Sequence, residues 1–169
     1  SVRPEDPDFI PNEYAAGVVV DKRGLILTAA HVLNERSSYW ITTADRKHYR
    51  AKVKGSDPRS DLAVLEIDAS DLTPITFGDG AKVRKGQIVI SLGNPYAIAR
   101  DGQASASWGI VSNISRKAPP SPLDDTDSGK NQLQHFGTLI QTDAKLSLGT
   151  SGGALVNLKG EMIGLTTGI

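Results

Sequence analysis

The sequence predicts an all-β fold made of two small barrels packed together. Short runs rich in Val, Ile, Leu and Thr alternate with Gly, Asn, Asp and Pro, and no long stretch has a helical period. The 17 glycines and 9 prolines provide for many tight turns. Because a chain of 169 residues can bury a core of its own, we expect a single domain over residues 1–169.

Ten strands are expected along the chain, each a short apolar run bounded by turn residues. Runs before Gly78-Asp79-Gly80 form the first barrel, at about residues 15–78, and later runs form the second, at about residues 81–169. The expected strands are residues 15–20, 25–29, 38–43, 49–54, 62–67, 87–92, 104–112, 138–142, 154–157 and 161–167. The turns between them include Asp21-Lys22-Arg23-Gly24, Asp57-Pro58-Arg59-Ser60, Gly93-Asn94-Pro95 and residues 157–160.

One segment, residues 117–134, interrupts this pattern. It holds three prolines and three aspartates among small polar residues, with too little apolar content for a core. We expect a mobile surface loop; a linker between domains is the alternative.

Composition excludes several function classes. The 19 basic and 19 acidic residues balance, which argues against a nucleic-acid partner. Without cysteine there is no disulfide, thiolate zinc site or cysteine nucleophile. No apolar run approaches the roughly 18 residues of a membrane span. We expect no metal, because the ligand spacing of a metal site is missing from Asp124, Asp125, Asp127 and His135. The two tryptophans in strand-like runs, Trp40 and Trp108, are expected to be packing groups rather than platforms on which nucleic-acid bases stack.

Three residues stand in settings that suit serine hydrolysis. His31 follows the apolar run 25–29, although a lone histidine there is more often structural. Asp61 precedes the run 62–67, where a turn aspartate that bonds its own backbone is the ordinary explanation. Ser151 lies in Gly149-Thr150-Ser151-Gly152-Gly153, whose glycines allow backbone N–H groups to approach a reacting atom; a glycine-rich hairpin would have the same pattern.

Taken together, these residues supply a nucleophile, a base and an acid. Serine hydrolysis needs Ser151 to attack, His31 to take its proton and Asp61 to orient the histidine, and it needs no cofactor. The G-x-S-x-G pattern also occurs in α/β-hydrolases, but there the acid and the histidine follow the serine. Residues 152–169 contain neither His nor Asp, which argues against that fold.

Three segments also carry a family resemblance. They are Leu27-Thr28-Ala29-Ala30-His31-Val32, Asp61-Leu62-Ala63-Val64-Leu65, and Gln141-Thr142-Asp143-Ala144 leading to Gly149-Thr150-Ser151-Gly152-Gly153-Ala154-Leu155. With them the chain resembles, over nearly its whole length, the protease domain of the HtrA/Deg family of trypsin-like serine proteases. The resemblance implies a chymotrypsin-like fold of two packed six-stranded antiparallel β-barrels, with the second barrel truncated at Ile169. It also implies an endopeptidase that works through an acyl-enzyme.

The same resemblance implies further site residues. It places an oxyanion hole at the backbone N–H groups of Gly149 and Ser151. It places the pocket for the P1 side chain of a substrate around Leu146, Leu165, Thr166 and Thr167. No carboxylate is available there, so we expect small or medium apolar P1 residues; entry of the Lys145 ammonium would favour acidic ones instead.

The chain departs from the family pattern at three places, one of which is the long loop after Lys117, whose composition is unusual and which enlarges the gap before the serine. Thr150 stands where the family usually has Asn or Asp, and its β-branched side chain is expected to oppose the turn of the oxyanion loop. The first strand reads Tyr14-Ala15-Ala16-Gly17-Val18, without the usual Gly-Ser-Gly.

The resemblance finally implies partners and a location. We expect unfolded or misfolded proteins or peptides as substrates, a role in protein quality control, a homotrimer formed through an N-terminal segment with Phe9 and Tyr14, and a PDZ domain in the parent protein. We expect an extracytoplasmic location, in the bacterial periplasm or cell envelope, with an organelle as the alternative. Two other functions stay open: a protease-fold chaperone or peptide-binding module with an inactive or regulated site, and a trypsin-like protease outside the HtrA group.

Overall fold

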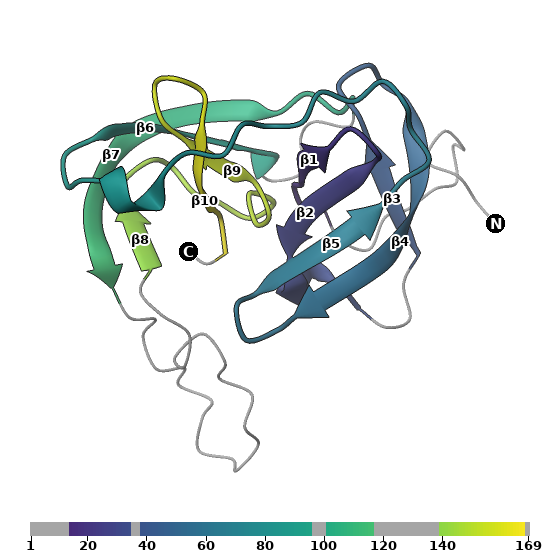
Figure 1. The fold of residues 1–169 in the computed structure, drawn as a ribbon, viewed down its shortest axis with the longest axis horizontal. Helices are drawn as coiled ribbons and strands as arrows, with labels where there is room; N and C mark the ends of the chain where they lie inside the picture. Colours follow the sequence, from purple (N-terminus) through teal and green to yellow (C-terminus); the bar gives the residue numbers. More distant parts are fainter. Residues whose placement is uncertain (1–13, 35–37, 96–100, 117–138, 168–169) are drawn as a thin grey trace, which may run out of the picture.

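A computed structural model describes residues 14–34, 38–95, 101–116 and 139–167 and confirms the all-β prediction. Two curled antiparallel sheets lie side by side (Figure 1). The first has the order β1-β2-β5-β4-β3, from β1 (Val18–Asp21), β2 (Leu25–Ala29), β3 (Tyr39–Thr42), β4 (His48–Asp57) and β5 (Leu62–Glu66). The second has the order β10-β9-β6-β7-β8, from β6 (Ile88–Gly93), β7 (Ser105–Arg116), β8 (Leu139–Thr142), β9 (Ala154–Val156) and β10 (Met162–Leu165).

The strands lie at or near the ten expected runs. Within the described ranges each sheet contains five strands, beside the six per barrel that the family resemblance implied for the whole domain. The first strand begins at Val18 rather than at residue 15, because the Ala16 N–H donates to the Ser151 carbonyl (2.9 Å) instead of joining the β1–β2 pairing.

The pairing of β2 with β5 determines where the first two candidate site residues lie. Ala29 at the end of β2 is opposite Leu62 at the start of β5. His31 follows Ala29 in the short 3-10 helix η1 (Ala30–Val32), and Asp61 immediately precedes Leu62. Antiparallel pairing therefore brings two residues that are 30 positions apart to the same edge of the first sheet.

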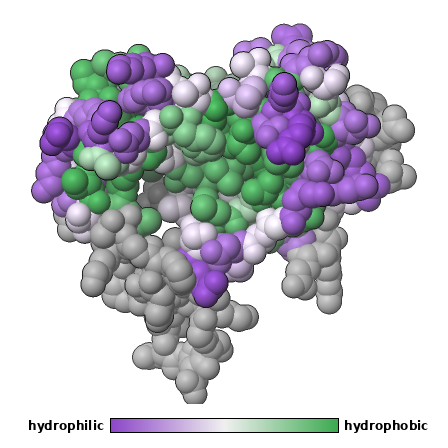
Figure 2. All heavy atoms as spheres, viewed as in Figure 1, coloured by the Kyte–Doolittle hydropathy of each residue, from purple (hydrophilic) through white to green (hydrophobic). Residues whose placement is uncertain are grey.

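Three apolar clusters form the core. One lies within the first sheet (Ile26, Ala51, Leu65 and Ile67), and one lies within the second (Val83, Val89, Val111 and Leu155). The third joins Val18 of β1 to Ala154 and Val156 of β9 and to Met162 of β10. Figure 2 shows hydrophobic residues gathered over the middle of one face, where the sheets meet, with polar side chains around them. Burial of each large aliphatic side chain contributes about 1.5–3 kcal/mol, so this third cluster holds the two sheets together.

The segment between β5 and the 3-10 helix η2 (Gly80–Lys82) crosses from one sheet to the other (Figure 1). The Ile75 N–H donates to the Val19 carbonyl (2.8 Å) of the first sheet. On the second sheet, the Gly78 N–H donates to the Met162 carbonyl and the Met162 N–H to the Thr76 carbonyl, both at 2.8 Å. These backbone bonds add to the apolar contact between the sheets.

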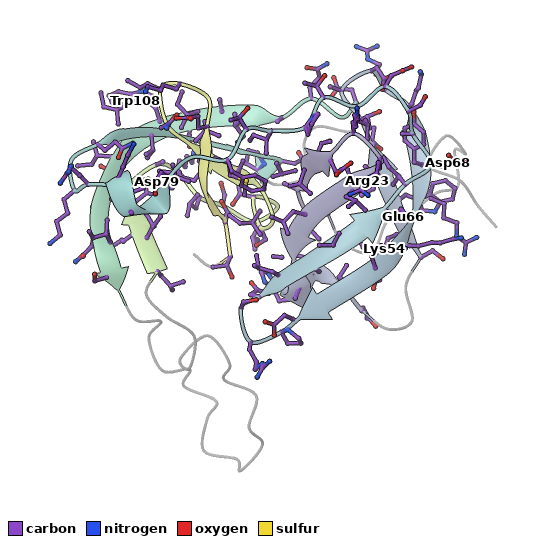
Figure 3. All side chains as sticks on the ribbon, viewed as in Figure 1. Arg23, Lys54, Glu66, Asp68, Asp79 and Trp108 are labelled. Carbon is purple, nitrogen blue, oxygen red and sulfur yellow. The ribbon has the colours of Figure 1, made fainter. Side chains whose placement is uncertain are left out.

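Trp108 does not pack inside the second sheet as we expected. The side chain projects outward from β7 (Figure 3) and the residue is 74% exposed. Its neighbours Gly109 and Val111 are buried, whereas Ile110 is also exposed. The period-two alternation of the strand therefore places Trp108 on the outer face.

Several expectations fall outside the described residues. These are the mobile loop at 117–134, the acidic residues within it, His135 and Phe9. In the ranges that the structure describes, no helix has the length and apolar character needed to span a membrane.

Candidate active site

The Asp61 carboxylate contacts both the backbone N–H and the imidazole ring of His31. The carboxylate accepts the His31 backbone N–H through Oδ1 (2.8 Å) and lies 2.7 Å from the ring Nδ1 through Oδ2. Asp61 is 4% exposed, and a buried carboxylate needs such partners to offset the loss of water. The acceptor at Nδ1 selects the tautomer that carries its proton there, which leaves the lone pair of Nε2 free to accept a proton.

Asp61 has two further attachments that are invisible in the sequence. The Thr167 hydroxyl donates a hydrogen bond to Oδ2 of Asp61. The Asp61 backbone is left-handed, with φ 55°, and its carbonyl accepts the Ala30 N–H (3.0 Å). Left-handed backbone is unfavourable for most residues but tolerated by Asp, so these bonds hold a mildly strained conformation in place.

Ser151 lies across the boundary between the sheets from this pair. Its Oγ is 3.2 Å from Nε2 of His31, so the structure brings together the three residues that the sequence singled out. The Ser151 carbonyl accepts the Ala16 N–H, and the Gly152 N–H donates to the Thr166 carbonyl (2.8 Å). The serine is thus fixed by backbone contacts on both sides.

Gly152 is required by this arrangement. Its φ is +83°, and a Cβ built there would lie 2.2 Å from the Ala16 carbonyl oxygen and 2.3 Å from the Thr28 hydroxyl. The Thr28 hydroxyl itself donates to the Ala16 carbonyl (2.8 Å), so neither group is free to move aside. Only a residue without a side chain permits so close an approach.

The backbone donors expected for an oxyanion hole are available. Within the described ranges, neither the Gly149 N–H nor the Ser151 N–H donates a hydrogen bond to another protein group. Gly149 adopts φ +89°, and its carbonyl accepts the Asn94 N–H (3.3 Å). This leaves two unpaired N–H groups on either side of Thr150.

Thr150 does not oppose the turn of this loop, contrary to our expectation. The left-handed conformation falls on Gly149, whereas the non-glycine residues with positive φ in the described part of the chain are Arg46 and Asp61. Thr150 is buried, at 3% exposed, and its hydroxyl bonds to the backbone of Ser147. A β-branched side chain is therefore compatible with the turn.

The residues expected around the P1 pocket lie in different surroundings. Leu146 is half-buried in the segment that leads to the nucleophile. Leu165 packs against the apolar cluster between the sheets, and Thr166 is buried, with its N–H bonded to the Gly153 carbonyl (2.8 Å). Thr167 contacts Asp61. Leu165 thus contacts the apolar core, and Thr167 contacts the carboxylate of Asp61.

No three His, Asp or Glu side chains are grouped as metal ligands in the part of the chain that the structure describes. His48, a second histidine there, bonds through Nδ1 to the Thr42 hydroxyl (2.8 Å) across β3 and β4.

Comparisons with known proteins identify the family of the chain. Residues 15–165 match the trypsin-like peptidase domain family. The chain is 38% identical over 168 residues to the periplasmic pH-dependent serine endoprotease DegQ of Escherichia coli (strain K12), covering 98% of this chain and 33% of the relative. It is 38% identical to the periplasmic serine endoprotease DegP of Salmonella typhimurium (strain LT2), covering 91% of this chain and 30% of that one.

Solved structures give the same result. The HtrA-type protease AlgW with a decapeptide superposes with a TM-score of 0.77 at 31% identity, over 92% of this chain and 43% of that one. The chain spans about a third of the length of the curated relatives. With the family match, the identity to DegQ and DegP and the shared fold, the chain belongs to the trypsin-like serine proteases of the HtrA/Deg family.

Proposed function

We propose that this chain is the catalytic domain of a serine endopeptidase with the triad Ser151, His31 and Asp61. The observation that carries this proposal is the continuous line of contacts from the Asp61 carboxylate through the imidazole to the serine hydroxyl, at 2.7 Å and 3.2 Å. The 3.2 Å contact suits proton transfer from Ser151 to His31, and the 2.7 Å contact orients the imidazole and stabilises its charged form.

The first half-reaction forms an acyl-enzyme. Ser151 Oγ attacks the carbonyl carbon of the scissile peptide bond while its proton passes to Nε2 of His31, and the charged imidazole is stabilised by the Asp61 carboxylate. Negative charge develops on the substrate carbonyl oxygen, where the N–H groups of Gly149 and Ser151 donate to it. The tetrahedral intermediate then collapses, the C–N bond breaks, and His31 gives its proton to the departing amine.

The second half-reaction restores the enzyme. Water attacks the ester carbonyl and loses a proton to His31, and the C–O bond to Ser151 breaks as the serine regains that proton. Each step uses groups of this chain and water only.

For substrate choice we propose small or medium apolar P1 residues. The candidate pocket residues are Leu146, Leu165, Thr166 and Thr167. No Asp or Glu lies between residues 144 and 160 to receive a basic P1 side chain. A peptide library with the scissile bond after each amino acid tests this. Preference for Glu or Asp at P1 would instead implicate the exposed Lys145.

For the full-length protein we propose cleavage of unfolded or misfolded proteins in the bacterial periplasm, as part of protein quality control. The support is that the matched relatives are named periplasmic serine endoproteases. From the family resemblance we also propose a homotrimer and a PDZ domain. Light scattering tests the first, since a monomer mass at micromolar concentration would contradict it, and intact mass spectrometry of the parent protein tests the second.

Labelling with a fluorophosphonate tests the proposed activity directly. The probe phosphonylates a serine only where a neighbouring base activates it, so Ser151 in the folded protein should be labelled and S151A should not. Stable binding of unfolded peptides without labelling would contradict the protease and favour a chaperone or peptide-binding module.

A further inference from the structure

The turn from Ser147 to Thr150 carries one of the two oxyanion donors, and its geometry is held largely by one side chain. The Thr150 hydroxyl donates to the Ser147 carbonyl (2.6 Å) and accepts the Ser147 N–H (3.2 Å). The Thr150 N–H also donates to the Ser147 carbonyl (3.0 Å). These three bonds, here named the Thr150 clasp, close the turn on both sides of Leu148 and Gly149.

The clasp is shielded from water. Thr150 is 3% exposed and Ser147 is 6% exposed, so water cannot readily replace the hydroxyl as a partner. Without the hydroxyl, the buried Ser147 N–H would have no partner, and an unsatisfied buried donor is costly enough to reopen a turn. The hydroxyl therefore controls the turn more strongly than one surface hydrogen bond would.

The end of β6 supports the other side of the turn. A Cβ added at Gly93 would lie 3.0 Å from Thr150 Cα and 3.2 Å from its methyl carbon, so the threonine packs directly on the glycine backbone. Asn94, the next residue, donates its N–H to the Gly149 carbonyl (3.3 Å). Fixing that carbonyl also fixes the plane of the peptide between Gly149 and Thr150, and hence the course of the chain from one donor to the other.

We propose that the Thr150 hydroxyl is a positioning group that preorganises the oxyanion hole by closing this turn from within. It touches neither substrate nor the reacting atoms; it acts through the backbone of Gly149. The inference rests on the proposed protease function and deepens it by assigning a role to Thr150, one of the positions at which the chain departs from its family. As a result, the Gly149 N–H already points toward the oxyanion position before substrate binds.

Three substitutions separate hydrogen bonding from packing. T150V keeps the branched shape that packs on Gly93 and removes the hydroxyl. T150S keeps the hydroxyl and removes the methyl. S147A is the matched control, because Ser147 Oγ is a buried hydroxyl of the same turn that has no hydrogen-bond partner among the described residues.

Steady-state cleavage of a chromogenic peptide is the first measurement. T150V should lower kcat by roughly 10- to 100-fold with KM changed less than about twofold, because loss or misplacement of an oxyanion donor weakens the transition state rather than substrate binding. The pH dependence of the remaining activity should be unchanged, since His31 and Asp61 are untouched. T150S and S147A should stay within about threefold of the unsubstituted protein.

Amide hydrogen exchange at Ser147 is the second measurement, and it does not depend on activity. In T150V the Ser147 amide hydrogen should exchange with solvent faster than in the unsubstituted protein. In T150S its exchange rate should be unchanged. Unchanged exchange and kcat in T150V would overturn the clasp, and so would equal losses in T150V and T150S, which would trace the effect to packing. If the fluorophosphonate does not label Ser151 in the unsubstituted protein, the proposed protease function fails. The hydrogen-exchange result still decides whether the Thr150 hydroxyl holds the turn.

Discussion

Thr167 donates a hydrogen bond from its hydroxyl to Asp61 Oδ2, across 106 positions of the chain. The same oxygen contacts His31 Nδ1. The threonine follows the end of β10 in the second sheet, whereas the aspartate precedes β5 in the first. The orientation of the carboxylate therefore depends on how the two sheets pack.

Removal of the Thr167 hydroxyl should lower activity through Asp61. A hydrogen bond to a charged group contributes about 1.5 kcal/mol or more, so T167V should lower kcat by roughly tenfold. T167S keeps the hydroxyl and should retain most activity. Peptide cleavage with both variants checks this, and equal activity of T167V and the unsubstituted protein would show that the contact does not orient the carboxylate in catalysis.

Substitution of the nucleophile or the base should abolish cleavage. S151A and H31A should each lower kcat by roughly 10⁶-fold, because the members of such a triad act as one unit. H48A is the matched control, since His48 bonds to Thr42 away from the candidate site. Casein cleavage is the measurement, and substantial activity in either triad variant would contradict the mechanism.

A side chain at Gly152 should destabilise the fold far more than one at another left-handed glycine. G152A forces a Cβ to within 2.2 Å of the Ala16 carbonyl oxygen. Gly160 has a similar φ of +77°, but nothing lies within 4 Å of its added Cβ. G160A should therefore cost only about 1 kcal/mol of unfolding free energy, for backbone strain, and G152A about 3 kcal/mol or more. Urea unfolding compares them, and similar losses would show that the close approach at Gly152 is not rigid.

The turn between β1 and β2 should give the protein a component of stability that disappears in acid. Hydrogen bonds from the Arg23 side chain and backbone lower the pKa of the partly exposed Asp21 carboxyl to about 2. A lowered folded-state pKa stabilises the protein at pH values above the usual carboxyl pKa of about 3.9 and ceases to do so as the pH falls through about 2.

D21N should thus melt slightly below the unsubstituted protein at pH 6, with a difference that closes between about pH 4 and about pH 2. R23Q removes the partner and should behave in the same way. Melting curves across this range provide the measurement, and a difference independent of pH would contradict the ionic origin.

The sequence was informative wherever the signal was local. Apolar runs between turn residues located the strands, and the neighbourhoods of His31, Asp61 and Ser151 were distinctive enough to single out the three residues that the structure brings together. The contact between Thr167 and Asp61 could not be predicted, because a side-chain hydrogen bond across two sheets leaves no spacing pattern.

Two other misses have identifiable physical reasons. Trp108 was misplaced because alternation along a strand does not say which face is buried when small residues surround it, as in Ser105-Ala106-Ser107-Trp108-Gly109. The expectation for Thr150 was wrong because it rested on the conformational preference of a β-branched residue by itself. In the structure the left-handed conformation, which such a residue resists, falls on the neighbouring Gly149.

The division of the site between the two sheets also bears on how the chain is synthesised. His31 and Asp61 emerge early, and Ser151 follows 120 residues after the histidine. A nascent first sheet contains a base without a nucleophile, and a second sheet folded alone contains a serine that nothing activates. Under the proposed mechanism, cleavage therefore requires the two sheets to dock, because only then does the Ser151 hydroxyl meet the His31 ring.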